Sequence, residues 1–315
     1  APASRAAMGS TAKPCVGGAA PEAVSLAFMA DTTWAVRLQR DVVRAAGPDA
    51  ETFLQGQLSQ DVAALGVGQS AWSLLLQPAG KVDAWLRVTR RGADEFALDV
   101  DHGWGEGVMA RLTRFRLRVK CDLELATAGC VAVRGDVPAA DRPDGGLIVV
   151  WPGADGFDLL GDAVAVPEDI VERPYDAYEA LRIECGVPAM GAELTERTIP
   201  AETGQWLIDA SVSFTKGCYT GQELVARIDS RGGHVPRRLR GIVVKGPTSP
   251  PVGAELRSVE GKVVGELTSV VLSAARGGSI GLGYVGRAVE PPAAVTLAWP
   301  GGETEARVEE LPLVS

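Results

Sequence analysis

The sequence is poor in histidine, in paired cysteines and in long apolar runs. Its 315 residues include two histidines, His102 and His234, so a histidine-based metal site or a Ser-His-Asp triad would need nearly the whole supply. The five cysteines are odd in number and form no Cys-x-x-Cys motif, which argues against a disulfide framework and against a structural zinc site. No apolar run reaches the roughly 18 residues of a membrane helix. We therefore expect a protein of the reducing cytoplasm that has no membrane segment.

Positive charge is scarce relative to negative charge. The formal net charge of −9 at pH 7 disfavours nonspecific binding to nucleic acid or to anionic membranes. Residues 111–120 are the exception, because they contain five cations, and Arg111, Arg114 and Arg118 fall on one helical face. A stripe of this kind is usually a solvated or ion-paired face. Contact with RNA and docking of a partner protein stay open as alternatives.

Composition divides the chain into three segments. Residues 1–30 are rich in Ala, Gly, Ser and Pro, and we expect a flexible tail there. Residues 31–234 mix helical and strand periodicities, which is typical of an α+β region and suits two subdomains. Residues 235–315 carry short Val, Leu and Ile runs between Gly and Pro, which predicts a small antiparallel β-barrel.

Apolar spacing locates the individual elements. The first α+β set has a helix opening at Pro48-Asp49, a helix at 108–117, and strands at 34–43, 70–77, 82–89 and 96–100. The second set has a helix at 175–185, stopped by Gly186, and strands at 121–125, 130–134, 147–151 and 157–160. Residues 191–213 lack strong periodicity and predict a long connection that lines a site. The barrel strands are expected at 239–244, 254–258, 262–271, 279–285, 293–299 and 304–309.

The most informative segment is Lys216-Gly217-Cys218-Tyr219-Thr220-Gly221-Gln222-Glu223. It places the Cys218 thiol between the Lys216 cation and a helix expected at residues 221–228. A nearby cation and the free N–H groups of a helix start both favour thiolate over thiol, so we expect a lowered cysteine pKa and a reactive Cys218. The alternative is that Cys218 is a small buried hydrophobic residue, as most free cysteines are.

This segment, followed by Val225-Ala226-Arg227, resembles the signature of the YgfZ proteins, folate-binding relatives of the glycine-cleavage T-protein. The resemblance extends from about Val36 to the C-terminus, and its other blocks are 53–62, 80–83, 182–188 and 199–202. It implies an aminomethyltransferase-like folate-binding fold, with two ferredoxin-like α+β subdomains and a C-terminal barrel. It also implies a role in supporting iron–sulfur enzymes or cluster-assembly proteins, including those of tRNA modification.

The resemblance assigns the ligand tetrahydrofolate, or a one-carbon derivative, to particular side chains. Glu202, in the Pro-x-Glu step, would accept two parallel N–H bonds from the pterin edge. Arg227 or Lys216 would lie near an acidic group of the ligand, although Arg227 could instead pair with Glu223 four residues earlier. Asp83 is the second acidic candidate, with a solvated strand edge as the alternative.

Three further side chains are assigned to the ligand site. Gln222 belongs to the signature, and Tyr219 and Trp206 could stack on a pterin or benzoyl ring, although buried core aromatics look the same in sequence. Cys218 and Lys216 complete the expected site as the reactive pair. A resident iron–sulfur cluster is not expected, because the signature supplies a single cysteine, with Cys185 the one other that the fold could bring near.

Three functions compete on this sequence. The first is a monomeric tetrahydrofolate-binding accessory protein that uses Cys218. The second is a folate-dependent aminomethyltransferase or demethylase, and it is disfavoured because Asp83 is followed by Ala84, whereas T-proteins carry adjacent aspartates there. The third is a scaffold that binds RNA or protein without catalysis.

Overall fold

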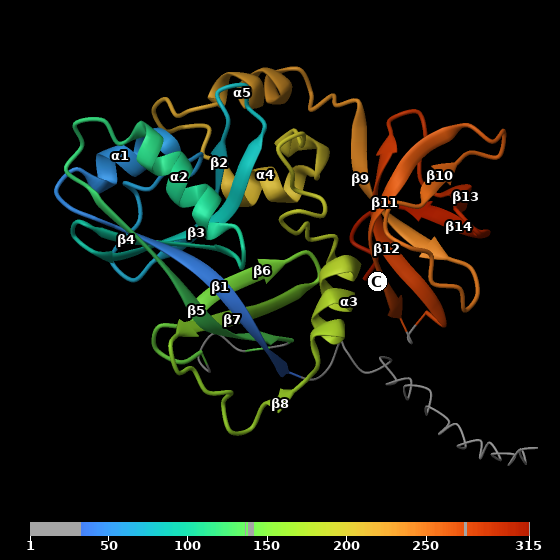
Figure 1. Cartoon of the computed structure of the whole chain (residues 1–315), viewed down its shortest axis with the longest axis horizontal. Coiled ribbons are helices and arrows are strands. Elements are labelled where there is room, and N and C mark those ends of the chain that lie inside the picture. Colours follow the sequence, from blue (N-terminus) through green and yellow to red (C-terminus); the bar gives the residue numbers. More distant parts are fainter. Residues whose placement is uncertain (1–32, 136, 138–141, 274–275, 315) are drawn as a thin grey trace, which may run out of the picture.

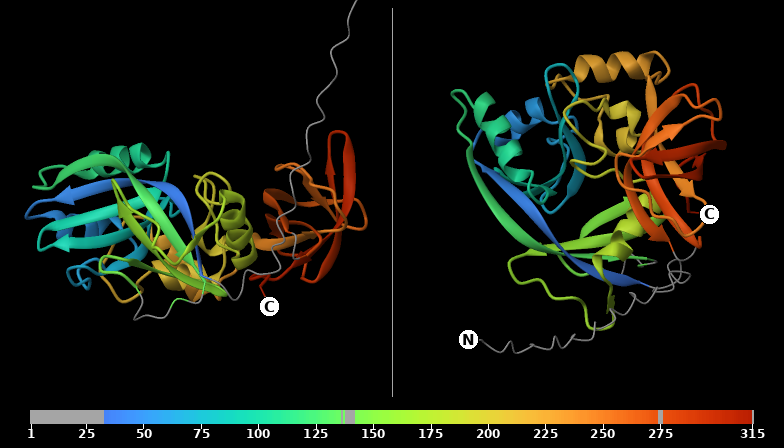
Figure 2. Two further views of the ribbon diagram at one scale, coloured as in Figure 1. Left: turned by 90° about the horizontal axis from the view of Figure 1, so that it is seen from below. Right: turned by 45° about the vertical axis from the view of Figure 1, so that its right-hand side comes forward.

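The computed structural model describes residues 33–135, 137, 142–273 and 276–314. The tail expected at residues 1–30 lies outside them. A large sheet occupies one end of the molecule and a barrel the other (Figure 2). The expected α+β fold with a C-terminal antiparallel barrel is confirmed.

The large sheet has eight strands, of which seven form a continuous antiparallel path. Their order is β2 (Ser70–Leu76), β3 (Val82–Gly92), β4 (Glu95–Asp101), β1 (Trp34–Ala46), β5 (Asp122–Arg134), β7 (Ala154–Gly161) and β6 (Leu147–Trp151). The short β8 (Val171–Glu172) pairs in parallel with the start of β1. The strands of both predicted α+β sets therefore belong to one sheet (Figure 1).

Strands β1 and β5 join the two sets. They pair without interruption from Trp34 opposite Arg134 to Ala46 opposite Asp122. The prediction of two separate strands at 121–125 and 130–134 is therefore wrong. The intervening residues, Ala-Thr-Ala-Gly, have little strand propensity of their own, but pairing with the long β1 extends the strand through them.

Short helices cover the sheet and connect it to the signature. They are α1 (Ala50–Gln57), α2 (Gly105–Phe115), α3 (Tyr175–Cys185), α4 (Gln205–Ser211) and α5 (Gln222–Ser230), with a 3₁₀ turn at Pro200–Glu202. The α3 helix ends as predicted at Gly186, whose φ of 71° gives the left-handed cap that glycine adopts at low cost. The expectation of a long connection over 191–213 is corrected, because the 3₁₀ turn and α4 lie within it.

The barrel is closed by six strands, each at a predicted position. In barrel order they are β10 (Glu255–Arg257), β11 (Val263–Ser273), β12 (Gly278–Gly286), β9 (Arg237–Val244), β14 (Gly302–Glu309) and β13 (Ala293–Trp299). Alternate residues fill a separate core, which includes Ile242, Leu256, Leu267 and Leu297. This alternation is the period of two that the sequence displays.

Helix α3 lies between the large sheet and the barrel (Figure 1). A buried polar cluster, formed by Arg182, Glu193, Thr268 and Ser269, fixes this junction. The fully buried Glu193 carboxylate accepts hydrogen bonds from Thr268 Oγ1 and Ser269 Oγ of β11, both at 2.6 Å. Its other oxygen accepts from Arg182 Nη1 of α3 at 3.2 Å. The cluster therefore ties the barrel to the helix that borders the cavity described below.

Within residues 33–314, apart from the few positions that are not described, no helix combines the length and the apolar character needed to cross a bilayer.

Candidate functional site

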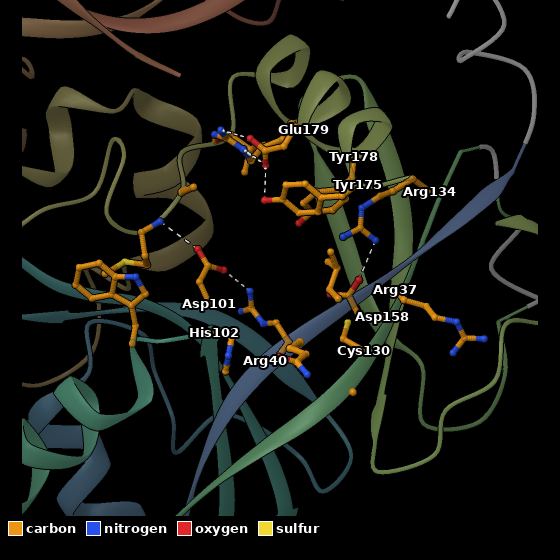
Figure 3. Close-up of a pocket in the computed structure, with 18 of the residues that line it drawn as sticks. Arg37, Arg40, Asp101, His102, Cys130, Arg134, Asp158, Tyr175, Tyr178 and Glu179 are labelled. Atoms are coloured by element: carbon orange, nitrogen blue, oxygen red, sulfur yellow. Dashed lines mark hydrogen bonds and ion pairs between the residues drawn. The ribbon is translucent and has the colours of Figure 1, made fainter. Parts of the chain in front are cut away.

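A cavity of about 780 Å³ lies between the concave side of the large sheet and α3 (Figure 3). Strands β1, β3, β4, β5 and β7 contribute to its wall, and residues 187–190 close it beside α3. Its volume is that of a typical small-molecule site. Tyr175 and Tyr178 on α3 face Arg40 and Asp101 across the opening.

Aromatic side chains line two sides of the cavity. Trp72 of β2 stacks on Trp85 of β3 with ring centroids 4.2 Å apart. On the α3 side, the ring centroid of Tyr178 lies 5.9 Å from that of Tyr175 and 5.5 Å from that of Trp151 of β6. Flat apolar surfaces of this kind suit a planar aromatic ligand.

An alternating ion-pair network of three arginines and three aspartates runs along the wall of the cavity. In order of contact its members are Arg134, Asp158, Arg87, Asp99, Arg40 and Asp101. Arg87 donates to both oxygens of Asp99 at 3.0 and 3.1 Å, and to Asp158 at 3.0 Å. Because β3 and β7 are separated by three strands in the sheet, the Arg87–Asp158 contact requires the sheet to curve around the cavity.

Asp158 stays ionised in this network although it is buried. Burial alone would raise the pKa of Asp158, but the guanidinium groups of Arg134 and Arg87 outweigh it, so the pKa is lowered. Burial raises the pKa of Tyr178 to about 12, which keeps this cavity tyrosine neutral at physiological pH. The cavity therefore offers fixed charges from the network and neutral aromatic surface from α3.

Among the polar side chains of the wall, Asp101 and Arg37 are accessible to a ligand. The Asp101 carboxylate is about one-third exposed, at 36%, and accepts the Met190 N–H at 3.0 Å and a bond from Arg40. The Arg37 side chain is 54% exposed and donates to Glu172 at 3.2 Å and to the Val164 carbonyl. One face of the site thus has a carboxylate with spare acceptor capacity, and another has an accessible cation.

Sequence reasoning missed this network, although a signal for it was present. Arg87, Asp99, Arg134 and Asp158 each interrupt a run that otherwise predicts a buried strand. Buried charges are nearly always paired. Four such interruptions therefore indicate an internal ion-pair network, but the pairing of strands distant in sequence decides its members.

The signature loop packs on the C-terminal end of α1, and Lys216 anchors it. Its ammonium donates to the carbonyls of Gln55, Leu58 and Gln60 at 2.7, 2.7 and 2.8 Å. Carbonyls at a helix C-terminus attract a cation. All three N–H groups are used in this way, so none is left to bond to Cys218. Burial lowers the pKa of Lys216 to about 8. A role for Lys216 in the chemistry of the Cys218 thiol stays a prediction.

Cys218 is exposed, which excludes the alternative of a buried hydrophobic residue. Helix α5 begins at Gln222, which is half-buried, after Gly221 at the cap position, so the thiol precedes the helix by a short turn. Tyr219 is buried beneath Lys216, whose Nζ lies 5.2 Å from the ring centroid. Cys185 is buried in α3, and burial raises its pKa to about 12. Cys185 is therefore a protonated, buried thiol at physiological pH, whereas Cys218 is exposed to solvent.

Glu202 is buried and already paired. Its Oε2 accepts from Arg237 at 3.1 and 3.2 Å and from the Ile199 N–H at 3.3 Å. Arg237 in turn lies over the ring of Tyr284 in the barrel. This carboxylate therefore joins the 3₁₀ turn to the first barrel strand, and its contact with a pterin stays a prediction.

Asp83 has different hydrogen-bond partners from those of Glu202. Its Oδ2 accepts from Arg111 Nε at 3.0 Å, and Arg111 also donates to the Leu76 carbonyl. The expected helical stripe of Arg111, Arg114 and Arg118 is wrong, because α2 ends at Phe115 and Arg118 follows it with a φ of 61°. Arg111 serves as an internal partner, whereas Arg114 and Arg118 are exposed.

The remaining predicted residues, Arg227 and Trp206, do not line the cavity. Arg227 is exposed on α5. Trp206 of α4 packs edge-on against Trp85, with centroids 6.0 Å apart, and so supports the aromatic wall from behind. Among the residues that the structure describes, none of the eight predicted site residues lines the cavity.

Comparisons with known proteins agree with this architecture. A family model of the glycine cleavage T-protein C-terminal barrel domain matches residues 237–315. The chain is similar to the tRNA-modifying protein YgfZ of Enterobacter sp. strain 638, with 32% identity over 212 residues that cover 59% of this chain and 64% of that protein. It is 29% identical to the tRNA-modifying protein YgfZ of Serratia proteamaculans over 256 residues, which cover 73% and 76% of the two chains. The match therefore spans less than two thirds of the Enterobacter protein's own length.

A solved structure shows the same fold. The glycine cleavage system aminomethyltransferase T from Bartonella henselae superposes with a TM-score of 0.73, covering 92% of this chain and 88% of that one at 21% sequence identity. The expected aminomethyltransferase-like architecture is thus confirmed as a fold, and the resemblance stated from the signature is confirmed by the curated relatives.

Proposed function

We propose that this chain, which is similar to the YgfZ proteins, belongs to their family, binds tetrahydrofolate or a one-carbon derivative, and supports iron–sulfur enzymes. The observation that carries the folate half of the proposal is the 780 Å³ cavity, which combines stacked aromatic walls with fixed charges in an aminomethyltransferase-like fold. The protein is proposed to act as a monomer in the cytoplasm.

The cavity matches reduced folate group by group. The pterin ring is flat and would pack against the wall formed by Trp72 and Trp85. Its N–H edge requires a carboxylate, and Asp101 offers one inside the cavity. The acidic glutamate tail would find the exposed guanidinium of Arg37. The resemblance assigns the pterin to Glu202 instead, so these two carboxylates are alternatives that one experiment separates.

Isothermal calorimetry with tetrahydrofolate under reducing conditions tests the folate half. We expect the parent protein to bind, and Asp101→Asn to weaken binding by about tenfold or more, because a charge-assisted hydrogen bond contributes roughly 1.5–3 kcal/mol. If Glu202→Gln weakens tetrahydrofolate binding and Asp101→Asn does not, the pterin binds at the Glu202 carboxylate beside Arg237. Asp155→Asn, an exposed change on β7, serves as the control and should bind like the parent. A parent protein that gives no heat would contradict the proposal.

The iron–sulfur half rests on the exposed thiol. Cys218 is presented to solvent on a loop that Lys216 anchors, and it is outside the cavity lining, so it can meet a partner protein while the ligand stays enclosed. The relatives are named tRNA-modifying proteins. We propose that the clients include iron–sulfur enzymes that modify tRNA, and that Cys218 reacts with a disulfide or a sulfur species of a partner.

Replacement of Cys218 by alanine should leave folding and tetrahydrofolate affinity nearly unchanged, because an exposed side chain contributes little to stability. The same variant should fail to restore iron–sulfur-dependent tRNA modification in cells that lack the protein. Thr215→Ala, an exposed change in the same loop, is the matched control and should restore it. Equal rescue by Cys218→Ala and the parent would remove the thiol from the mechanism.

A further inference from the structure

A guanidinium on α2 joins three segments that are separate in sequence. Arg111 Nε donates to Asp83 Oδ2 at 3.0 Å, at the start of β3. Its Nη1 donates to Gln57 Oε1 at 3.2 Å at the end of α1, and its Nη2 donates to the Leu76 carbonyl at 3.0 Å at the end of β2. The Phe115 ring centroid lies 3.8 Å from the guanidinium carbon, and the Arg111 side chain is 11% exposed. This one side chain therefore fixes the ends of a helix and of two strands relative to one another.

The signature loop, residues 216–223, rests on two of these segments through its backbone. The Thr220 N–H donates to the Gly56 carbonyl in the last turn of α1 at 3.1 Å. Gly221 has a φ of 83° and passes so close to β2 that a Cβ atom added there would lie 2.7 Å from Leu76 Cβ. Such a conformation and such a close approach both favour glycine. The loop is therefore seated on the ends of α1 and β2.

The third segment meets the helix that follows the loop. Figure 1 shows the β2–β3 hairpin reaching α5. In its turn, a Cβ atom added at Gly80 would lie 2.4 Å from Leu224 Cβ, so the turn packs directly on α5. Asp83 follows this turn after three residues. The three acceptors of Arg111 are thus within three residues of the three contacts that support the loop and its helix.

Cys218 lies between two sets of anchors. On one side, the Lys216 ammonium is bound by carbonyls of residues 55–60. On the other side, Thr220 and Gly221 make the contacts described above. The Cys218 side chain is itself exposed, so burial of that side chain does not fix its place. The position of the thiol therefore depends on how firmly α1, β2 and β3 are held.

We propose that Arg111 and Asp83 are a positioning pair for the signature loop. Arg111 holds α1, β2 and β3 in the arrangement that seats the loop, and Asp83 orients and neutralises the guanidinium. Asp83 thereby acts on the thiol through Arg111 and makes no contact with the ligand. The inference rests on the proposed function, because it takes presentation of Cys218 to a partner as the purpose of the loop.

A nitroxide spin label on Cys218 tests the pair in the folded protein. The other cysteines that the structure describes are buried, so a Cys15→Ser background directs the label to Cys218. We expect Arg111→Gln and Asp83→Ala each to shorten the rotational correlation time of the label by about twofold or more, because the loop loses its support. Arg114→Gln is the control, since it is an exposed change on the same helix and should leave the spectrum unchanged.

Two conservative variants separate positioning from general stability. Asp83→Glu keeps a carboxylate for Arg111 and should give a spectrum close to that of the parent. Arg111→Lys keeps the cation without the planar fork, so it should fall between the parent and Arg111→Gln. The spectra are recorded on protein that circular dichroism shows to be folded, so a uniform loss of stability does not alter them. Should Arg111→Gln fail to fold, Asp83→Ala and Arg111→Lys make the same comparison. Spectra that match the Arg114→Gln control would overturn the inference.

Calorimetry with tetrahydrofolate separates positioning from a ligand role of Asp83. Asp83→Ala should bind within about twofold of the parent. Binding weakened by about tenfold with an unchanged label spectrum would place Asp83 at the ligand and overturn the inference. A parent protein that binds no tetrahydrofolate would contradict the folate half of the proposed function alone. The label reports on the loop without ligand, so its spectra would still decide the inference.

Discussion

Replacing Glu193 with alanine is expected to lower the free energy of unfolding by about 3–5 kcal/mol, because it breaks a buried ion pair with Arg182 and leaves buried donors without their acceptor. Glu193 is fully buried and accepts bonds from Arg182, Thr268 and Ser269. Truncation removes one of the two carboxylates that pair with Arg182, the other being Glu179, together with an acceptor of two barrel hydroxyls. The barrel would then lose part of its polar connection to α3.

Urea denaturation followed by tryptophan fluorescence and by far-ultraviolet circular dichroism measures this loss. Glu193→Gln keeps the shape and some hydrogen bonds, so a smaller loss of about 1.5–3 kcal/mol is expected. Glu196→Ala is the matched control, because its side chain is 74% exposed and its ion pair with Arg197 is a loose 4.0 Å contact. A change below about 0.5 kcal/mol is expected there. A Glu193→Ala protein as stable as this control would show that the polar cluster does not hold the barrel.

Replacing Asp158 with asparagine should cost a comparable amount, about 3–5 kcal/mol at neutral pH, because the aspartate separates two buried arginines. Its oxygens lie 3.0 Å from Arg87 Nη1 and 2.9 Å from Arg134 Nη1. Without the negative charge, these two cations repel each other in a site that water reaches poorly. The cavity wall would therefore lose its shape along with its stability.

The lowered pKa of Asp158 gives this prediction a pH dependence with a defined sign. The stabilisation is fully present above the carboxyl group's ordinary pKa of 3.8, and it is lost as the pH falls from there through the lowered folded-state pKa. The stability difference between the parent and Asp158→Asn should therefore be constant from pH 5 to 7 and shrink in stronger acid. Asp155→Asn, on the exposed turn side of β7, should show no such difference at any pH. A gap that widens in acid would contradict this account of the network.

The barrel shows where sequence alone is sufficient. Each of its six strands lies at a position that alternating apolar residues and Gly or Pro breakers predict. Neighbouring strands along the chain mostly pair with each other, so local patterns carry most of the information. The α3 helix is similar, since its apolar spacing and the Gly186 cap lie within one short segment.

The errors arise where pairing overrides local preference. Residues 126–129 do not look like a strand, yet the long β1 pairs across all of them. Helix α4 was missed because it has seven residues, too few to display a clear helical period. In both cases the stabilisation comes from contacts with distant segments, which a local pattern does not contain.

The sequence predicted the signature loop, but none of the predicted site residues lines the cavity among the residues that the structure describes. The signature correctly indicated an exposed cysteine on a tight loop before a helix. It could not indicate that the Lys216 ammonium is used by three carbonyls of residues 55–60, since those groups come from another part of the chain.

The order of residues by itself determined the class of fold, the barrel and the position of Cys218 on a loop before a helix, because periodicity, turn residues and a contiguous signature act over short distances. Only the tertiary structure decided which charges meet along the cavity wall, because Arg87 reaches Asp158 through the curvature of the whole sheet. That curvature depends on the combined twist of many strands, and no single segment encodes it.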